Sequence, residues 1–287
     1  MPSQALVVIN DASKPANIPG WRTIAKRCFE PGPHQADPYI RGMCLDLQTE
    51  SPHDASKIWV KFGSSITMGE ACTQHYVAHY LRNNDIPNVR VPLVYLAFKW
   101  EGYSFIVDEY IDGTTCDNSD IHRIAAAVQA LIAIPSPVET PGRVGGGLIE
   151  HPFFIDRHAS IEYGSVMDLQ DHINGILRVT GKTRRVDFSR ERGLCLCVSD
   201  LKFANFMKDR DGTIVAVDFG GYSFLPPSFF GHALEDSSLA HTLKYFLELP
   251  DFPSENLLAL MSASFSLVPF GSNKIGLPKR LKDKKSL

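Results

Sequence analysis

Three polar residues late in the chain have the types and the spacing that phosphoryl transfer requires. Asp200 and Asn205 stand in the segment V-S-D-L-K-F-A-N at 198–205, and Asp218 opens the triplet D-F-G. Transfer from ATP needs a carboxylate beside the acceptor hydroxyl, and a carboxylate and an amide that hold Mg²⁺ on the phosphates. Asp200, Asp218 and Asn205 supply these groups in that order. The D-x-x-x-x-N and D-F-G spacings together are much rarer than either alone and form the strongest signal in the sequence.

The composition of the chain is that of an ordinary globular protein. Of its 287 residues, 44% are hydrophobic and 21% are charged, which is enough apolar mass for one large or two modest cores. The net charge of −3 argues against a nucleic-acid partner, because nucleic-acid-binding domains are usually strongly basic. The one basic cluster, 274–285, is expected to be a solvated or frayed terminus.

Nothing in the sequence indicates a membrane partner. No apolar stretch reaches the ~18 residues of a spanning helix, and the N-terminus lacks the pattern of a signal peptide. The six cysteines form no C-x-x-C pair, and Cys195 and Cys197 alternate on one face of an expected strand. Reduced, buried thiols explain them best, so we expect a soluble, cytoplasmic protein.

The first ~110 residues have the pattern of a sheet with one helix. Residues 1–20 are weakly patterned and form either a flexible lead or an added strand. Strands are expected over 21–30, 39–47, 57–62, 89–98 and 103–110, and a helix over 68–83.

The remainder is mainly helical. Helices are expected over 121–134 and 166–180, and a helical region over 237–267. Between the first two lies a long irregular stretch, 136–160, and loops of this length are usually functional or disordered. The pattern therefore predicts a small sheet-rich half, a connector and a larger helical half, with a cleft between the halves.

With these motifs in place, the chain resembles the protein-kinase-like superfamily over roughly 57–230. The resemblance is strongest to the aminoglycoside phosphotransferase-like branch, and in particular to small kinase-like proteins common in fungi. It implies a bilobal α+β fold with a small antiparallel-sheet N-lobe over 1–110 and a hinge over 111–116. The larger, mainly helical C-lobe would span 117–287 and contain the catalytic loop, the metal-binding motif and the acceptor region.

The resemblance also implies how ATP and Mg²⁺ are bound. Lys61 matches the lysine of the third strand, which bridges the α- and β-phosphates, and Glu70 resembles the acid that positions it. Main-chain groups near Glu109 and Ile111 match the hinge that holds adenine.

The motif residues themselves match the catalytic and metal-binding positions of the superfamily. Asp200 would orient the acceptor hydroxyl and accept its proton, and Lys202 would neutralise the transferring phosphate. Asn205 and Asp218 would be the Mg²⁺ ligands.

The expected activity is thus an ATP- and Mg²⁺-dependent phosphotransferase acting on the hydroxyl of a small molecule, in a monomer. The acceptor would be held by 116–131 and 166–177. A protein kinase is less favoured, because few residues separate Phe224 from Phe229, where a protein kinase has a long activation segment.

Two departures motivate an alternative, a pseudokinase or repurposed kinase fold that binds a nucleotide or a partner without phosphoryl transfer. Val198 replaces a histidine of the superfamily, and the loop expected to cover the phosphates, 30–37, holds only Gly32 between two prolines.

Two further features stay without an assigned role. The run Gly145–Gly147 has three open interpretations: a phosphate contact, a flexible cover over the acceptor, or a plain loop. His75 and His79 are four apart on the expected helix, a spacing that can bind a metal. No Glu follows His75 as in a zinc protease, and the intervening tyrosine and valine indicate partial burial, so the sequence disfavours zinc there.

Overall fold

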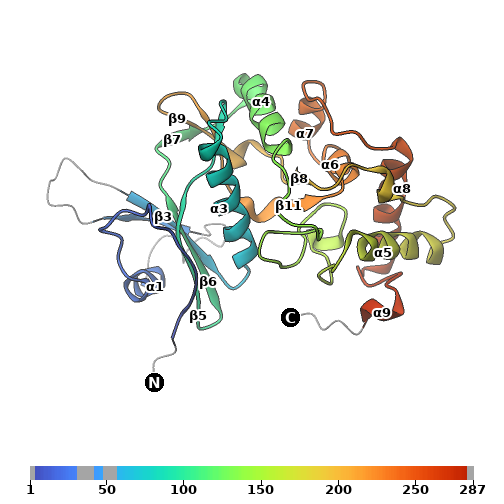
Figure 1. The fold of residues 1–287 in the computed structure, drawn as a ribbon, viewed down its shortest axis with the longest axis horizontal. Coiled ribbons are helices and arrows are strands. Elements are labelled where there is room, and N and C mark those ends of the chain that lie inside the picture. The colour runs from blue at the N-terminus through green and yellow to red at the C-terminus, as the bar shows by residue number, and fades with distance from the viewer. Residues whose placement is uncertain (1–3, 31–41, 48–56, 283–287) are drawn as a thin grey trace.

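The computed structural model describes residues 4–30, 42–47 and 57–282, and a sheet-rich part and a helical part lie side by side in it (Figure 1). The strands are β1 (Leu6–Asn10), β2 (Gly42–Asp46), β3 (Lys57–Gly63), β4 (Val89–Arg90), β5 (Val94–Trp100), β6 (Tyr103–Glu109), β7 (Gly113–Thr115), β8 (Cys195–Val198), β9 (Phe206–Asp209), β10 (Ile214–Ala216) and β11 (Tyr222–Leu225). The α-helices are α1 (Trp21–Phe29), α3 (Met68–Asn83), α4 (Ile121–Ile132), α5 (Val166–Val179), α6 (Pro227–Ala233), α7 (Ser238–Leu243), α8 (Ser254–Leu267) and α9 (Lys279–Lys282). Among the described residues, every helix is too short or too polar to span a bilayer.

The N-terminal sheet is antiparallel throughout, with the strand order β1-β5-β6-β3-β2. Successive side chains of a strand point to opposite faces, so β6 contributes to two separate cores. Phe105 and Val107 pack in the cluster that includes residues of α1, whereas Ile106 packs with Met68 and Ala71 of α3. One helix therefore covers each face of the sheet.

The segment 21–30, expected to be a strand, is the helix α1. Its buried residues are Ile24, Ala25 and Cys28, a spacing that places them on one side of a helix and would divide them between the two faces of a strand. The prediction was wrong because a short apolar pattern with helical period was assigned to a sheet. Of the two alternatives for residues 1–20, an added strand is present, since β1 pairs with β5 at the edge of the sheet.

A proline explains a second difference. The strand expected over 89–98 is interrupted, because Pro92 separates β4 from β5 and has no N–H to donate to a ladder. β4 instead pairs parallel with β10, while β5 pairs with β6. The helix expected over 68–83 is confirmed at both ends, and α4 and α5 end within two residues of their expected limits.

The helical part is built around the antiparallel pair β8 and β11. Helices α4 and α6 contact β8, while α8 packs against both α5 and α6. A four-stranded sheet, β4-β10-β9-β7, also belongs to this part, and Figure 1 shows β7 and β9 beside the N-terminal sheet. The α+β fold with a sheet-rich lobe and a helical lobe, expected from the sequence, is confirmed by this arrangement.

Candidate active site

Lys61, Glu70 and Asp218 meet between the two parts of the molecule. Thr67 caps α3 by accepting the N–H of Glu70 at 3.1 Å, which fixes the first turn of the helix opposite β3. Lys61 on β3 forms an ion pair with Glu70, and its Nζ lies 2.7 Å from Oδ1 of Asp218. Lys61 and Asp218 stand 157 positions apart in the chain, so only the tertiary fold brings them together.

The charge of Lys61 is stabilised at this position. Its side chain is 14% exposed and that of Glu70 is 5% exposed. Burial acts to lower the pKa of Lys61, but the carboxylates of Glu70 and Asp218 overcome it and raise this pKa above its ordinary value. Burial raises the pKa of Glu70, and Lys61 opposes this effect. Lys61 is therefore a fixed cation.

The loop between β8 and β9 contains Asp200, Lys202 and Asn205. Asn205 is buried, and its Nδ2 donates to the carbonyl of Asp200 at 2.8 Å and to Oδ2 of Asp200 at 2.9 Å. These two bonds use the amide nitrogen and leave the amide oxygen to be offered to a cation. Nζ of Lys202 lies 2.8 Å from Oδ1 of Asp200, and the Lys202 side chain is more than half exposed.

The loop between β10 and β11 lies against this first loop. The N–H of Val217 donates to the carbonyl of Asn205 at 3.0 Å, and the N–H of Ser199 donates to the carbonyl of Gly221 at 2.9 Å. Asp218 has a left-handed backbone, with φ 57°, which is uncommon outside glycine and is characteristic of functional sites. The structure thus places Asp200, Asn205 and Asp218 in two hydrogen-bonded neighbouring loops.

A cavity of about 390 Å³ opens beside these residues. Lys61, Glu70 and Asp218 all line it, and its walls also include apolar side chains from both parts of the molecule. The volume falls in the range of small-ligand sites, roughly 300–1,000 Å³. The remaining lining residues are Trp59, Gln74, Pro92, Asp108, Glu109, Tyr110, Ile111, Gly113, Met207 and Val217.

The two hinge residues named from the sequence, Glu109 and Ile111, both border this cavity. The side chain of Glu109 is turned to other partners, accepting from Arg90 at 2.8 Å and from the N–H of Leu93 at 3.3 Å. Its main-chain N–H donates to the carbonyl of Leu93 at 2.9 Å. These bonds use the side chain and the main-chain N–H of Glu109 but not its main-chain carbonyl.

Asp108 is a lining residue that the sequence analysis did not single out. It is 6% exposed, and its Oδ1 finds no hydrogen-bond partner among the described residues. Burial raises its pKa to about 8, against a smaller opposing effect of a hydrogen bond from Gln74. Asp108 is therefore largely protonated at neutral pH. Its position in an otherwise ordinary strand gave no sequence signal.

Arg143 links the D-F-G loop to α3. Its side chain is 3% exposed and donates to Oγ1 of Thr67 at 2.8 Å, to Oε2 of Glu150 at 3.0 Å, and to the carbonyl of Gly220. One guanidinium thus fixes the cap of the helix that positions Glu70 and the backbone two residues after Asp218.

Arg157 performs a similar task for Asp200. Its Nη2 donates to the carbonyl of Ser199 at 2.9 Å and to Oδ1 of Asp200 at 3.2 Å, while Nη1 donates to Asp236 at 2.8 Å. Arg157 and Asp156 both have positive φ, of 63° and 54°. Both arginines lie in the irregular stretch 136–160, whose length was the one sequence signal that could have found them.

The glycine run at 145–147 packs against α3. All three residues have positive φ, and a Cβ on Gly69 of α3 would lie 2.1 Å from the carbonyl oxygen of Gly146. The N–H of Val144, just before the run, donates to Oγ1 of Thr73 at 3.0 Å. Of the three interpretations, the contacts favour a loop that packs closely on the helix. The Gly32 loop lies outside the described residues.

The side chains that hydrogen-bond or ion-pair with the Asp200 carboxylate, those of Arg157, Lys202 and Asn205, come from outside the expected acceptor segments 116–131 and 166–177. Arg157 comes from the stretch between α4 and α5, and its partner Asp236 lies between α6 and α7. The two helices themselves bury their apolar sides in the core, so their expected role as the acceptor wall has no support in these contacts.

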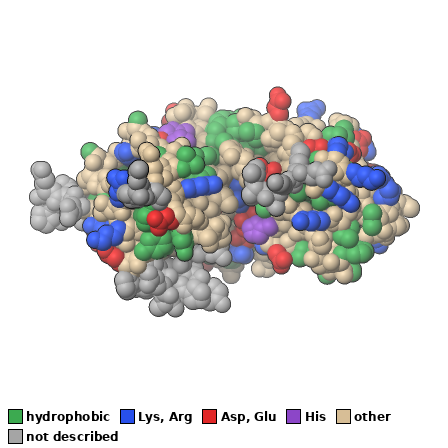
Figure 2. Space-filling model, turned by 90° about the horizontal axis from the view of Figure 1, so that it is seen from below, with side chains coloured by type: hydrophobic (Ala, Val, Ile, Leu, Met, Phe, Trp, Pro, Cys, Tyr) green, Lys and Arg blue, Asp and Glu red, His purple; other side chains and the backbone are tan. Residues whose placement is uncertain are grey.

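Within the described part of the basic cluster, 274–282, the chain packs on α5 instead of fraying, while the Arg280 side chain stays half exposed to solvent. Arg280 of α9 donates to Asp168 at 2.9 Å and to Asp171 at 2.8 Å, both on α5, and Leu281 is buried. Figure 2, which views the molecule from below, shows Lys and Arg side chains gathered over the helical part.

The cysteines are unbonded to one another, as expected. Four are buried, including Cys195 and Cys197 on β8, whereas Cys44 is exposed and Cys72 is intermediate. Burial raises the pKa of Cys195 to about 12, so this thiol stays protonated.

No protein-family model and no curated protein matches the chain. Among solved structures, it is similar to an aminoglycoside phosphotransferase, APH(4)-Ia, in a ternary complex with AMP-PNP and hygromycin B, at 14% identity and a TM-score of 0.47, over 80% of this chain and 85% of the other. It is also similar to choline kinase LicA from Streptococcus pneumoniae, at 17% identity and a TM-score of 0.42, over 81% and 82% of the two chains. A third is spectinomycin phosphotransferase APH(9)-Ia in complex with ADP and spectinomycin, at 9% identity and a TM-score of 0.44, over 98% and 86%. These likenesses are remote, with identities of 17% or less and TM-scores below 0.5.

Proposed function

We propose that this chain is an ATP- and Mg²⁺-dependent phosphotransferase that acts on the hydroxyl of a small molecule. The observation that supports it is the contact of Lys61 with both Glu70 and Asp218 in the wall of the cavity, where the loop of Asp218 is hydrogen-bonded to the loop of Asp200 and Asn205. If the Asp and Asn residues of these loops served only to cap and turn the chain, the contact of a buried lysine from a distant strand with Asp218 would have no explanation.

The residues present fit ATP and Mg²⁺. Asp218, with half of its side chain exposed, and Asn205 stand in two hydrogen-bonded loops and would offer a carboxylate oxygen and an amide oxygen, ligands of the kind that Mg²⁺ prefers. When bound, Mg²⁺ supplies positive charge that neutralises the phosphates. Lys61 would hold the α- and β-phosphates, and the carbonyl of Glu109 and the N–H of Ile111 would face the base.

Asp200 is assigned to the acceptor side. Its carboxylate would orient the hydroxyl and accept its proton as the phosphorus–oxygen bond forms. Arg157 and Lys202 contact Oδ1 of this carboxylate, so they would hold it in place. The half-exposed Lys202 can in addition offset charge on the transferring phosphoryl group.

A small-molecule acceptor is favoured over a peptide by the chain that follows Gly221. β11 is buried beside β8 and is followed almost at once by α6, whose residues Phe229 and Phe230 are buried as well. This segment therefore offers no exposed activation segment for a peptide groove.

We place the two lobes at 1–110 and 117–287, with 111–116 as the hinge of a cytoplasmic monomer. In support, β6 ends at Glu109 in the N-terminal sheet, whereas β7, which falls within the hinge range, already pairs with β9 of the helical part. Before residue 110, β4 also joins that sheet by pairing with β10. The chain between β6 and β7 runs along the cavity, which Tyr110 and Ile111 line.

The test measures ADP release by the purified chain with ATP, Mg²⁺ and a panel of hydroxyl-bearing amines, sugars and amino-sugar antibiotics. We expect ADP release that depends on one acceptor class. Asp200→Asn should reduce the rate about 10²–10⁴-fold, the contribution of a general base, and should leave Mg²⁺–ATP binding by thermal shift intact. Asp251→Asn, on an exposed loop, is the matched control and should be unaffected.

The alternative, a pseudokinase, is motivated by Val198 and predicts a different result. Mg²⁺-dependent ATP binding without ADP release for any acceptor would support it and would count against the proposed activity. Absence of nucleotide binding would refute the proposed activity and would favour the other form of the alternative, a repurposed kinase fold that binds a partner.

A further inference from the structure

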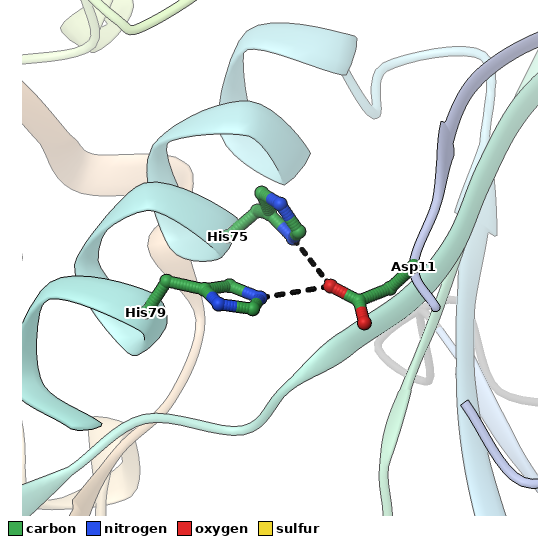
Figure 3. A group of neighbouring side chains, drawn as sticks. All are labelled: Asp11, His75 and His79. Carbon is green, nitrogen blue, oxygen red and sulfur yellow. Dashed lines mark hydrogen bonds and ion pairs between the residues drawn. The ribbon is translucent and has the colours of Figure 1, made fainter. Parts of the chain in front are cut away.

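Three side chains converge on the outer side of α3, away from the candidate active site. Figure 3 shows His75 and His79 of α3 pointing toward one carboxylate oxygen of Asp11, which directly follows β1. Nε2 of His79 lies 2.8 Å and Nδ1 of His75 lies 3.6 Å from Oδ2 of Asp11, and the three ligand atoms all lie within 4.8 Å of one another. Their spacing on the helix, i and i+4, places both imidazoles on one face.

The cluster contains an unsatisfied donor or acceptor. Nδ1 of His75 is buried and has no hydrogen-bond partner among the described residues, since 3.6 Å to Asp11 exceeds a hydrogen bond. Buried polar atoms without a partner are rare and call for an explanation. An ion between the three groups would satisfy this nitrogen, and imidazole is a ligand that transition metals favour.

Asp11 is already oriented as a ligand would be. Its Oδ1 accepts the N–H of Ser13 at 2.7 Å and the hydroxyl of Ser13 at 2.6 Å, and its own N–H donates to the carbonyl of Tyr95 on β5 at 3.0 Å. These bonds fix the carboxylate and direct Oδ2 to the histidines. Such outer partners are typical of metal-binding carboxylates.

The dimensions suit zinc. Ligand atoms held at about 2.0–2.1 Å from one tetrahedral Zn²⁺ are separated by about 3.3 Å, a value between the two distances from Asp11. The Asp11 side chain is 8% exposed while each imidazole is 33% exposed, so the cluster is closed on the protein side and open to solvent on the other. A site with three protein ligands leaves a fourth position for water.

We infer that Asp11, His75 and His79 form a binding site for a divalent transition metal of the zinc type. The sequence alone disfavours zinc at the histidine pair, because no Glu follows His75 and the tyrosine and valine between the histidines indicate partial burial. The third group, Asp11, is remote in the chain and joins the pair only through the pairing of β1 with β5. The ion would tie the N-terminal strand to α3. On a helix of about 3.6 residues per turn, His79 lies on roughly the opposite side from Glu70, so the site is separate from the active site.

The test uses the full chain, freed of metal with a chelator, and Zn²⁺ or Co²⁺ alone without nucleotide. We expect one Zn²⁺ per chain by calorimetry, a rise in melting temperature on Zn²⁺ addition, and a Co²⁺ absorption spectrum of low coordination number. His79→Gln and Asp11→Asn should each weaken Zn²⁺ binding by more than about 100-fold, because loss of an outer partner alone costs about 10–100-fold. His122→Gln, an exposed histidine on α4, is the matched control and should bind Zn²⁺ like the wild type.

Three outcomes would overturn the inference. The wild type could fail to bind Zn²⁺ at one per chain, Asp11→Asn could retain wild-type affinity, or His122→Gln could lose binding as the cluster variants do. Asp11→Asn keeps an oxygen that Ser13 can bond and is nearly isosteric, so circular dichroism of this variant separates loss of the ligand from loss of the fold.

Discussion

Asp108 is deeply buried, its Oδ1 has no hydrogen-bond partner in the part of the chain that the structure describes, and its pKa is raised. The free energy of unfolding should therefore depend on pH through this residue. In the unfolded chain it ionises near 3.8, whereas burial raises the folded-state pKa to about 8. Between these pH values the folded state binds the extra proton, so the stability of the wild type falls as pH rises through this window. Asp108→Asn lacks this loss.

We therefore expect Asp108→Asn to gain stability relative to the wild type between about pH 5 and about pH 8, by at most about 1.4 kcal/mol for each pH unit. Urea unfolding at several pH values measures this difference. Asp251→Asn, on an exposed loop, should show no such trend. Parallel pH profiles for Asp108→Asn and the wild type would mean that the folded state accommodates the ionised carboxylate.

Replacement of Lys61 should measure how much the ion pair with Glu70 contributes to the free energy of unfolding. Lys61→Met leaves a carboxylate that is 5% exposed without its cation, and breaking a buried pair costs about 3–5 kcal/mol. Lys61→Met combined with Glu70→Gln should recover much of the loss, because no unpaired charge remains. Urea unfolding of the single and double variants gives the coupling energy. If the double variant were as unstable as the sum of the single variants, the pair would not be coupled.

At the residue scale, the sequence was informative where the chemistry is local. Asp200, Asn205 and Asp218 belong to short motifs with fixed spacing, so they could be predicted from the chain alone. Arg143 and Arg157 could not, because each acts through groups far along the chain, such as Gly220 and Asp200. A lone arginine in a long loop has no spacing that distinguishes it from a solvated one.

At the scale of elements, α3 is held to the D-F-G loop by the guanidinium of Arg143. Arg143→Lys keeps the charge but cannot bond Thr67, Glu150 and Gly220 together, because an ammonium lacks the planar fork. We expect a loss of about 1–3 kcal/mol and faster hydrogen exchange in the first turn of α3. Denaturant unfolding and mass spectrometry of exchanged peptides measure both.

The control for Arg143→Lys is Arg178→Lys on the exposed side of α5, which should stay within about 0.5 kcal/mol of the wild type. Equal exchange in α3 for Arg143→Lys and the wild type would show that the helix needs no support from Arg143.

The elements that were predicted well are those with a long pattern and a clear end. α3 is 16 residues long, with an apolar stripe in its second half, a capping Thr67 and a turn after Asn83. α1 was missed because nine residues give too few repeats to separate a period of 3.6 from one of 2. The break at Pro92 was visible in the sequence, but which sheets β4 and β5 would join was set by distant partners.

At the scale of the whole molecule, the chain passes between the two lobes more than once within the short segment 89–115. β4 pairs with β10 of the helical part, β5 and β6 return to the N-terminal sheet, and β7 pairs with β9. Arg90 spans the junction, since Nη1 donates to Glu109 at 2.8 Å and Nε donates to Asp209 at 2.8 Å. This bridge also restrains Glu109 at the rim of the cavity.

Arg90→Ala should therefore change ligand binding more than stability. The Arg90 side chain is 36% exposed, so its ion pairs are screened and their loss should cost about 1 kcal/mol, less at high salt. Loss of the restraint on Glu109 should weaken ATP binding several-fold by calorimetry. Arg210→Ala, which removes an ion pair with Asp112 whose side chains are 80% and 60% exposed, is the matched control for a surface charge near the same junction. If both variants weakened ATP binding equally, net charge would be the cause, and the bridge through Arg90 would have no separate part in shaping the cavity.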